Sequence, residues 1–466
     1  MNKIPFLIPG VAVLLGGCTL MPKYERPKAP ISEAWPNGAA QTNAAPKTAA
    51  DIDWQEFFDD PRLQNLIRLA LENNRDLRIA ALRVEEARAQ YRIQRSELFP
   101  GAEGRANMYR QKISGTATAF QGGSLITTYT VDVGAAWEAD LFGRIRSLKR
   151  AALERYFASD EGRKSAQMAL VSAVASEYLS QLRLREAKAV ANETLKAVQN
   201  SYDLIKRSFE AGASSELDLR SAEGQVQAVR VNAANFLQLL AESENALVVL
   251  IGQPLPEDLP PGKPFQEQQL LSDLPAEVPS EVLQRRPDIL AAEHTLKAAS
   301  ADIGAARAAF FPRILLTGAA GTASAKLTDL FTGPSATWNF SPQITIPIFD
   351  VGGTRSRLDV AKITKSIEIA NYEKAIQNAF REVANALAVR SILDEKLKAQ
   401  ELLLNAQQKR FDLATARYRQ GIDSYLDVLL AQQDLYIAQQ NLLQFQADRL
   451  LNSIALYRSL GGGWKS

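Results

Sequence analysis

Residues 418–431 read Tyr-Arg-Gln-Gly-Ile-Asp-Ser-Tyr-Leu-Asp-Val-Leu-Leu-Ala, and residues 209–222 read Phe-Glu-Ala-Gly-Ala-Ser-Ser-Glu-Leu-Asp-Leu-Arg-Ser-Ala. The two stretches share an aromatic residue, Gly, Ser, Leu, Asp and Ala at a constant offset of 209. In each stretch the Gly can end one helix in the left-handed conformation, and the Ser three residues later can cap the next helix. Each stretch therefore predicts the tip of a helical hairpin, and the predicted tip residues are Gly212, Ser215, Gly421 and Ser424.

The duplication extends beyond the tips, because the same offset also relates Gly252 to Gly461. An internal repeat on this scale decides the architecture before any local prediction does. We therefore expect two repeats of one plan, 61–253 and 281–466, joined by a Pro-rich connector at 254–280.

Proline is absent between Pro100 and Pro254 and again after Pro347. These runs can hold long helices, since a Pro inside a helix costs about 3 kcal/mol. Their apolar residues recur every three to four positions, which is typical of a coiled coil.

From Tyr129 to Leu141 apolar residues alternate with small or polar ones, and 337–348 alternates in the same way. Alternation predicts strands with two different faces, long enough to cross a membrane, which takes ~9–11 tilted residues. Pro342 then fits only an edge strand, a bulge or a strand end. Within each repeat we expect the same order of elements: a helix at 61–98 or about 281–309, a strand pair at about 102–141 or 313–348, and a helical hairpin at about 144–250 or 354–456.

Four strands per chain cannot close a membrane barrel, because the smallest single-chain barrels have eight strands. Open edges in hydrocarbon would leave backbone groups unpaired, at several kcal/mol each. We therefore expect three copies of the chain to share one barrel of twelve strands. The coiled-coil hairpins would continue it as a helical stem of ~100 Å, at ~1.5 Å per residue.

The N-terminal residues 1–17 have the pattern of a signal peptide, with an apolar run too short to span a bilayer as a helix. The run ends in Leu15-Gly16-Gly17-Cys18, which resembles the bacterial lipoprotein box. This predicts a lipid on Cys18, followed by an N-terminal arm at 18–60 that is rich in Pro and Ala. The alternative is an ordinary secretory signal with a chance Cys.

The composition excludes several functions. With 54 basic and 52 acidic residues, the net charge of +2 gives no support for nucleic-acid binding. One Cys and one His leave almost no material for disulfides, metal sites or His-dependent catalysis. We interpret His294 as a structural residue, and we expect neither an enzyme nor a cofactor, apart from the covalent lipid.

The order of strand pair, helical hairpin, strand pair and helical hairpin resembles the TolC family of outer-membrane efflux proteins. The motif Tyr418-x-x-Gly421 followed by Leu426-Asp427-Val428-Leu429-x-Ala431-Gln432 is similar to the second hairpin tip of that family. The lipoprotein box, the Arg286-Pro287-Asp288 turn and the terminal Gly-Gly-Gly-Trp resemble its lipoprotein branch, of the NodT or OprM type.

The resemblance implies a mainly α fold with membrane β-strands: a trimeric twelve-stranded β-barrel continued by an α-helical coiled-coil barrel with an equatorial collar. It implies a lipid-anchored homotrimer in the outer membrane of a Gram-negative bacterium, extending into the periplasm. The implied partners are a periplasmic adaptor and an inner-membrane pump, usually of the RND class. The implied function is the export of drugs or other small molecules, controlled by a gate at the periplasmic helix tips.

Asp427 matches a position at which family members close the tunnel with a ring of acidic side chains. The alternative is that Asp427 only serves the start of its helix, three residues after Ser424. Asp218 has the same placement after Ser215, so capping alone can explain both residues, although Asp218 is also a candidate for a gate contact.

The second acidic position of some relatives falls at Leu430, so Leu426 and Leu430 are predicted to narrow the pore with apolar side chains. Tyr418 is predicted either to hold neighbouring hairpins together through its hydroxyl or to pack within the coiled coil. The family's basic residue two positions after the tip Gly is replaced by Asp423, so a salt-bridged latch of that type is not expected.

Two other readings remain open. The chain could be the exit duct of a type I protein-secretion system, although the lipoprotein box and the terminal Gly-Gly-Gly-Trp favour drug efflux. It could also be a periplasmic adaptor or a coiled-coil scaffold without a transport function. The second hairpin and the membrane-type strands, with Trp137 and Trp338 on them, argue against that reading.

Overall fold

The computed structural model describes residues 19–32, 35, 49–114, 124–271 and 285–465; the predicted signal peptide and Cys18 lie outside them. The chain divides into two compact units, which we describe separately. The first comprises Met1–Lys28, Arg83–Asp160 and Ala291–Tyr372, and the second comprises Ala29–Leu82, Glu161–Leu290 and Glu373–Ser466. Each repeat contributes its strand pair to the first unit and its helical tip to the second, so the units do not coincide with the repeats.

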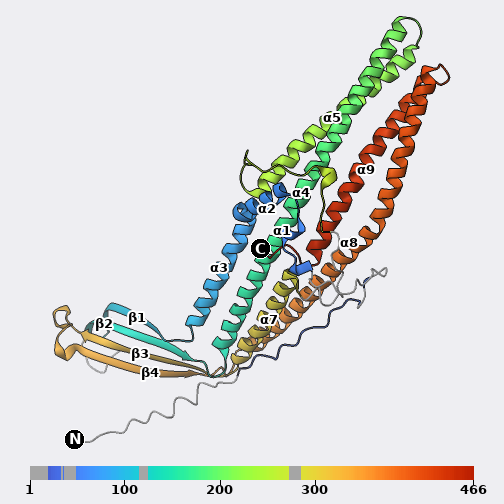
Figure 1. Cartoon of the computed structure of the whole chain (residues 1–466). Coiled ribbons are helices and arrows are strands. Elements are labelled where there is room, and N and C mark those ends of the chain that lie inside the picture. The colour runs from blue at the N-terminus through green and yellow to red at the C-terminus, as the bar shows by residue number, and fades with distance from the viewer. Residues whose placement is uncertain (1–18, 33–34, 36–48, 115–123, 272–284, 466) are drawn as a thin grey trace. The chain divides into compact units, whose positions relative to one another are not determined.

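The first unit contains a four-stranded antiparallel sheet in the order β1-β2-β3-β4 (Figure 1). The central pair, β2 and β3, joins the two repeats. Pro342 lies in β4, an edge strand of the sheet, as expected for a residue without a backbone N–H. The strands are β1 (Gly101–Ile113), β2 (Ser124–Ala139), β3 (Arg313–Ser324) and β4 (Ala336–Thr345).

Two strand bounds differ from the alternation in the sequence. β2 begins at Ser124 rather than near Tyr129, because its pairing with β1 continues to the end of that strand at Ile113. β4 ends at Thr345 rather than at residue 348, because its pairing with β3 ends where that strand begins, at Arg313.

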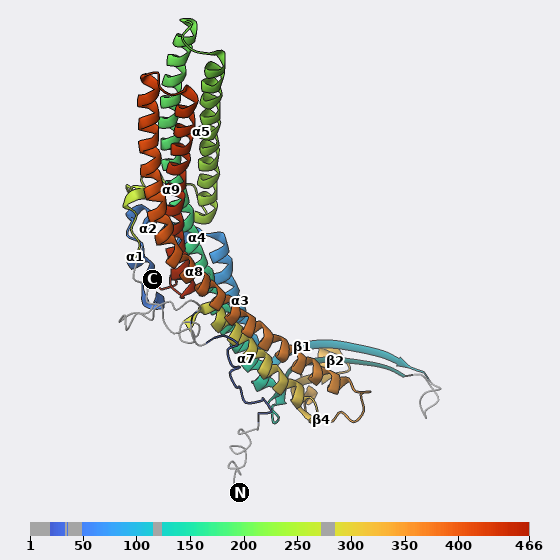
Figure 2. The same ribbon diagram turned by 90° about the vertical axis from the view of Figure 1, so that its right-hand side faces the viewer.

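Four long helices form the two hairpins, whose tips lie at the same end of the second unit (Figures 1 and 2). Among the described helices, only α5 is long and apolar enough to cross a membrane, judged by its length and composition alone. It packs on α4 through a buried cluster of Val198, Val226 and Val229, and we therefore assign it to the coiled coil. The helices are α4 (Arg144–Glu210), α5 (Glu216–Ile251), α8 (Gly353–Arg419) and α9 (Tyr425–Ser459).

The helix expected at 61–98 is interrupted at Asn74, which separates α2 (Pro61–Asn73) from α3 (Arg75–Ser96). Asn74 has an extended backbone, with φ of −60° and ψ of 131°. Its side chain donates to the carbonyl of Leu250 over 2.8 Å and accepts from the N–H of Leu77 over 2.9 Å. This tertiary contact and the new cap outweigh the continuous helical pattern of the sequence.

Within the helix expected at about 281–309, the structure describes α7 (Pro287–Ala308), and Arg286 before it is not helical. Proline is favoured at the first helical position, and its ring pushes the preceding residue, Arg286, out of the helical conformation. Residues 281–284, where we expected the helix to begin, lie outside the described part of the chain.

The end of the N-terminal arm enters the core of the second unit. The short helix α1 (Trp54–Phe57) buries Trp54 and Phe57 almost completely. The ring of Phe57 stacks on that of Tyr457, with centroids 4.0 Å apart. The Tyr457 hydroxyl donates to the carbonyl of Ile52 over 2.7 Å. The end of the arm therefore packs against the last helix of the chain.

Gly252 and Gly461 are equivalent positions of the two repeats, and they differ in how closely other parts of the chain approach them. Both have left-handed backbones, with φ of 81° and 87°. A Cβ on Gly252 would lie 2.4 Å from the carbonyl oxygen of Asn73, whereas the nearest atom to a Cβ on Gly461 is 3.6 Å away, on Arg286.

We expect Gly461→Ala to destabilise the fold by about 1–2 kcal/mol, the cost of a left-handed alanine. Gly252→Ala should cost about 1–3 kcal/mol more, because the new methyl group also collides with backbone. Thermal unfolding of the purified variants, followed by circular dichroism, measures the difference. Equal melting temperatures for the two variants would contradict the close approach at Gly252.

Candidate gate at the helical tips

The two tips have the same local construction. Gly212 and Gly421 follow the ends of α4 and α8 with φ of 75° and 72°, as the predicted helix ends required. Ser215 and Ser424 then precede α5 and α9 as N-caps in extended conformations. Together these residues reverse the chain within a few positions.

Asp218 and Asp427 both hold the caps of their helices. The Oδ2 atom of Asp218 accepts from the backbone N and the Oγ of Ser215, over 3.3 and 2.6 Å. The Oδ2 atom of Asp427 accepts from the same two atoms of Ser424, over 3.2 and 2.7 Å. These contacts form a capping box at each helix, which is the alternative role that the sequence offered for both aspartates. A further role of Asp427 in a ring at the pore stays a prediction.

The first turns of α9 have two different faces. Tyr425, Val428 and Leu429 are buried, whereas Leu426 is 55% exposed and Leu430 44% exposed. Asp427 is exposed on the same side as these two leucines. Residues three and four apart share one helix face, so the predicted constriction residues form one exposed patch of two apolar side chains around a carboxylate.

Tyr418 lies in a cluster that joins the two tips of one chain. Its ring centroid is 5.4 Å from that of Tyr425, and both pack with Ile205 and Ala222 of the first hairpin. Burial raises the pKa of Tyr425 to about 12, and burial together with the carboxylate of Asp218 raises the pKa of Tyr418. Both hydroxyls therefore stay protonated at neutral pH. Packing is the role that the contacts give Tyr418 here; a bond to a neighbouring hairpin remains a prediction.

An ion pair closes the second tip. Arg417 donates from Nε and Nη2 to the two carboxylate oxygens of Asp423, over 2.6 and 2.8 Å. The hydrogen bonds from Arg417 lower the pKa of Asp423. The pair is therefore formed above the usual pKa range of an aspartate and is lost only as the pH falls below that range. We did not predict this pair, although opposite charges six residues apart across a turn were a usable signal.

Beside the ion pair lies a hollow of about 610 Å³ on the second hairpin. Three basic side chains line it, together with the carboxylates of the tip. The charged residues of this lining are Lys409, Arg410, Arg417, Asp423 and Asp427. The hollow is therefore a polar surface of mixed charge at the end of the helical stem.

His294, interpreted as a structural residue, contacts a carboxylate. Its Nδ1 lies 2.6 Å from Oε2 of Glu154, a carboxylate that is almost fully buried. Despite burial, the hydrogen bond with His294 and the nearby Arg150 lower the pKa of Glu154. Among the described residues, no group of three or more His, Cys, Asp or Glu side chains could hold a metal ion. The contact joins α4 to α7 and supports a structural role for His294.

Comparisons with known proteins identify the family. The family model for "Outer membrane efflux protein" matches residues 66–253 and 278–462. The toluene efflux pump outer membrane protein TtgC of Pseudomonas putida is 45% identical over 468 residues, covering 100% of this chain and 96% of the relative. The outer membrane protein OprJ of Pseudomonas aeruginosa is 42% identical over 456 residues, covering 97% and 95% of the two chains.

Solved structures have the same architecture. The open-state MtrE outer-membrane channel of Neisseria gonorrhoeae matches with a TM-score of 0.86 and 41% identity, over 96% of this chain and 99% of that one. The CmeC outer-membrane channel of Campylobacter jejuni matches with a TM-score of 0.88 and 26% identity, over 96% and 95%.

The structural relatives are trimeric outer-membrane channels in which a β-barrel continues as a helical barrel, and the predicted fold class is therefore confirmed. The location in the outer membrane is confirmed by the same matches. The chain belongs to the outer membrane efflux protein family, and it is a channel protein rather than an enzyme.

Proposed function

We propose that three copies of this chain form the exit duct of a tripartite efflux pump, which receives small molecules from a periplasmic adaptor and an inner-membrane transporter of the RND class. Curated relatives that are 45% identical to this chain are named for the efflux of toluene, solvents and antibiotics. These names favour small, mostly apolar substrates over the protein substrates of a type I secretion system. They also favour a duct over an adaptor or a coiled-coil scaffold.

The exposed patch at the start of α9 is the observation that supports a gate. Leu426 and Leu430 expose apolar surface to water in the single chain, so they gain from burial against copies of themselves at the three-fold axis. Both capping bonds of Asp427 go to Oδ2, so its other carboxylate oxygen can face that axis. In this mechanism Asp427 both caps its helix and contributes one member of a three-membered acidic ring, with the leucines narrowing the pore beside it.

The adaptor docks at the same tips in this mechanism, which gives it direct access to the gate. The hollow beside the Arg417–Asp423 ion pair offers basic and acidic groups to a partner. Paired charges across an interface fix its register and speed association more than they add affinity. An adaptor that competes for Arg417 would break the ion pair of the tip and release the turn between α8 and α9.

The matched aspartates of the two tips separate gating from capping. Asp427→Ala and Asp218→Ala remove the same capping bonds, at a comparable cost of about 1 kcal/mol each. Only Asp427→Ala should remove charge from the constriction. We therefore expect larger and more frequent openings from Asp427→Ala than from Asp218→Ala or the native protein, measured as single-channel conductance in planar bilayers.

Neutral Asp427→Asn, which keeps most of the side-chain volume, distinguishes charge from size. If repulsion and hydration within an acidic ring control the pore, Asn should change the conductance and its dependence on salt. Equal conductance of the native, Asp427→Asn and Asp427→Ala channels would overturn the gate. Equal effects of Asp218→Ala and Asp427→Ala would reduce both residues to helix caps.

Lipidation of Cys18 is a separate proposal that rests on the sequence Leu15-Gly16-Gly17-Cys18. Cys18→Ser should prevent incorporation of labelled fatty acid into the protein, because the thiol is the site of attachment. Several acyl chains on one residue anchor a protein stably, whereas a single chain does not. Mass spectrometry of the mature N-terminus measures the modification directly. An unmodified Cys18 in the native protein would contradict this proposal and leave the ordinary secretory signal.

A further inference from the structure

The two faces of the four-stranded sheet differ in their charges. Residues directly opposite one another in the register point to the same side of the sheet, as do alternate residues along a strand. One face carries acidic and basic side chains together. The charged residues of that face are Glu103, Arg105, Asp132, Glu138 and Arg313.

The opposite face is apolar and aromatic, which marks it as the lipid face of a membrane barrel. Its aromatic residues include Tyr129, Trp137, Trp338 and Phe340, and Trp338 is 79% exposed in the single chain. Among the described strand residues this face has only two charged side chains, Arg110 and Lys112. Both are cations, both are exposed, and they lie two residues apart on β1.

The register places these cations at the height of the outer headgroups. The helical stem continues from the Ala139 end of β2, so the opposite end of the sheet faces outward. Trp137 and Tyr129 lie eight residues apart on β2, which at ~3.3 Å per residue and a tilt of ~40° corresponds to about 20 Å of height. This approaches the ~25 Å apolar band between two aromatic girdles.

Arg110 lies one row outward of Tyr129 on the lipid face. It pairs with Thr127, the next position on the lipid face after Tyr129, and Lys112 pairs with Leu125. A lipid-facing cation is costly at the middle of the bilayer and almost neutral at its surface. Within the part of the chain that the structure describes, neither cation pairs with a carboxylate. Both cations are therefore available to an anionic ligand.

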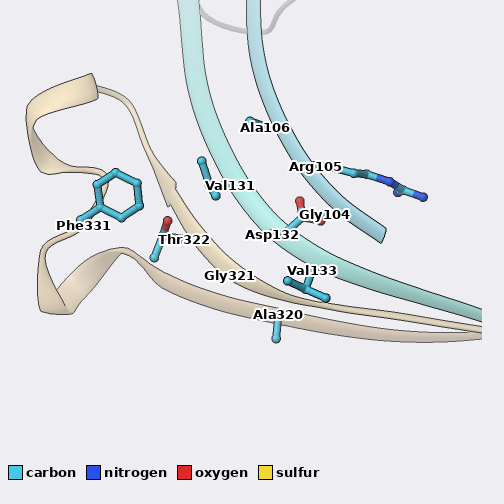
Figure 3. A pocket seen from close by; sticks show the side chains of 10 residues that line it. All are labelled: Gly104, Arg105, Ala106, Val131, Asp132, Val133, Ala320, Gly321, Thr322 and Phe331. Carbon is cyan, nitrogen blue, oxygen red and sulfur yellow. The ribbon is translucent and has the colours of Figure 1, made fainter. Parts of the chain in front are cut away.

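Below the two cations the lipid face has a hollow of about 490 Å³ (Figure 3). Its lining on this face consists of small or branched side chains of β1, β2 and β3, and Phe331 of the following loop closes one end. Ala106 lies four residues before Arg110 on β1, or ~13 Å at ~3.3 Å per residue. The lining residues on this face are Gly104, Ala106, Val131, Val133, Ala320 and Thr322. The hollow also touches Arg105, Asp132 and Gly321, which the register assigns to the charged face.

We propose that this part of the lipid face binds a phosphorylated lipid of the outer leaflet, with an acyl chain in the hollow and its phosphate on Arg110 and Lys112. Arginine and lysine both bind phosphate oxygens, and arginine does so through two parallel N–H donors. The small and branched side chains that line the hollow on the lipid face give the acyl chain more contact than a flat strand surface. The site lies on the outside of the barrel and is independent of the gate.

Lipid binding can be measured on the intact protein in nanodiscs of phosphatidylcholine. The native trimer is titrated with diphosphorylated lipid A, with dephosphorylated lipid A as the second ligand, and bound lipid is counted by native mass spectrometry. Each cation near an anionic surface contributes enough for about a fivefold change in affinity. We expect Arg110→Gln to weaken binding of the phosphorylated lipid about fivefold and the Arg110→Gln/Lys112→Gln double variant about 30-fold.

Two matched controls test the two parts of the site. Lys362→Gln removes an exposed cation from α8, outside the sheet, and should leave lipid binding unchanged. Ala106→Phe fills the hollow and should weaken binding, whereas Ala102→Phe, on the same face of β1 but outside the hollow, should not.

Equal affinity of the native protein and the double variant would overturn the proposal, as would equal binding of the dephosphorylated lipid. If the double variant does not assemble, Arg110→Lys and Lys112→Gln singly preserve most of the charge and still test the phosphate contact. Channel conductance should be the same in all these variants, so the result is separate from the outcome of the gate experiments.

Discussion

Unpaired backbone groups cannot be hydrated inside a membrane, and this constraint determines the assembly of the protein. The sheet of one chain ends in two open edges, β1 and β4. In water such edges could be covered or charged, but in hydrocarbon each unpaired N–H or C=O costs several kcal/mol. Pairing with further copies removes the edges. The trimeric barrel is thus a consequence of strand number, and the helical stem is assembled by the same symmetry.

The two hairpin tips keep one capping motif in different surroundings after duplication. Ser215–Asp218 and Ser424–Asp427 make nearly identical capping contacts. What differs is the surrounding surface, because the second tip adds the Arg417–Asp423 ion pair and the hollow next to it. The capping contacts fix the start of each helix, and the difference between the two tips lies in the charges around them.

Buried polar groups position the elements that lie far apart in the sequence. In the second unit, Arg286 is almost fully buried and donates to the carbonyl of Ser459 over 2.8 Å. It also pairs with Asp288 and with Glu382, over 2.7 and 3.0 Å. A buried arginine without such partners would be very costly, so the pairing requires the start of α7, the middle of α8 and the end of α9 to meet. The Arg286-Pro287-Asp288 turn is therefore a structural junction within the second repeat.

The sequence by itself determined the order of elements, both tips and the need for more copies, because capping, proline placement and alternation act over a few residues. The break at Asn74, the early start of β2 and the burial of Trp54 depend on contacts with Leu250, with β1 and with the core. The Glu154 partner of His294 is likewise 140 residues away in the sequence. Only the tertiary structure decided these features, because periodicity reports which face of an element is apolar and not which distant residue will lie against it.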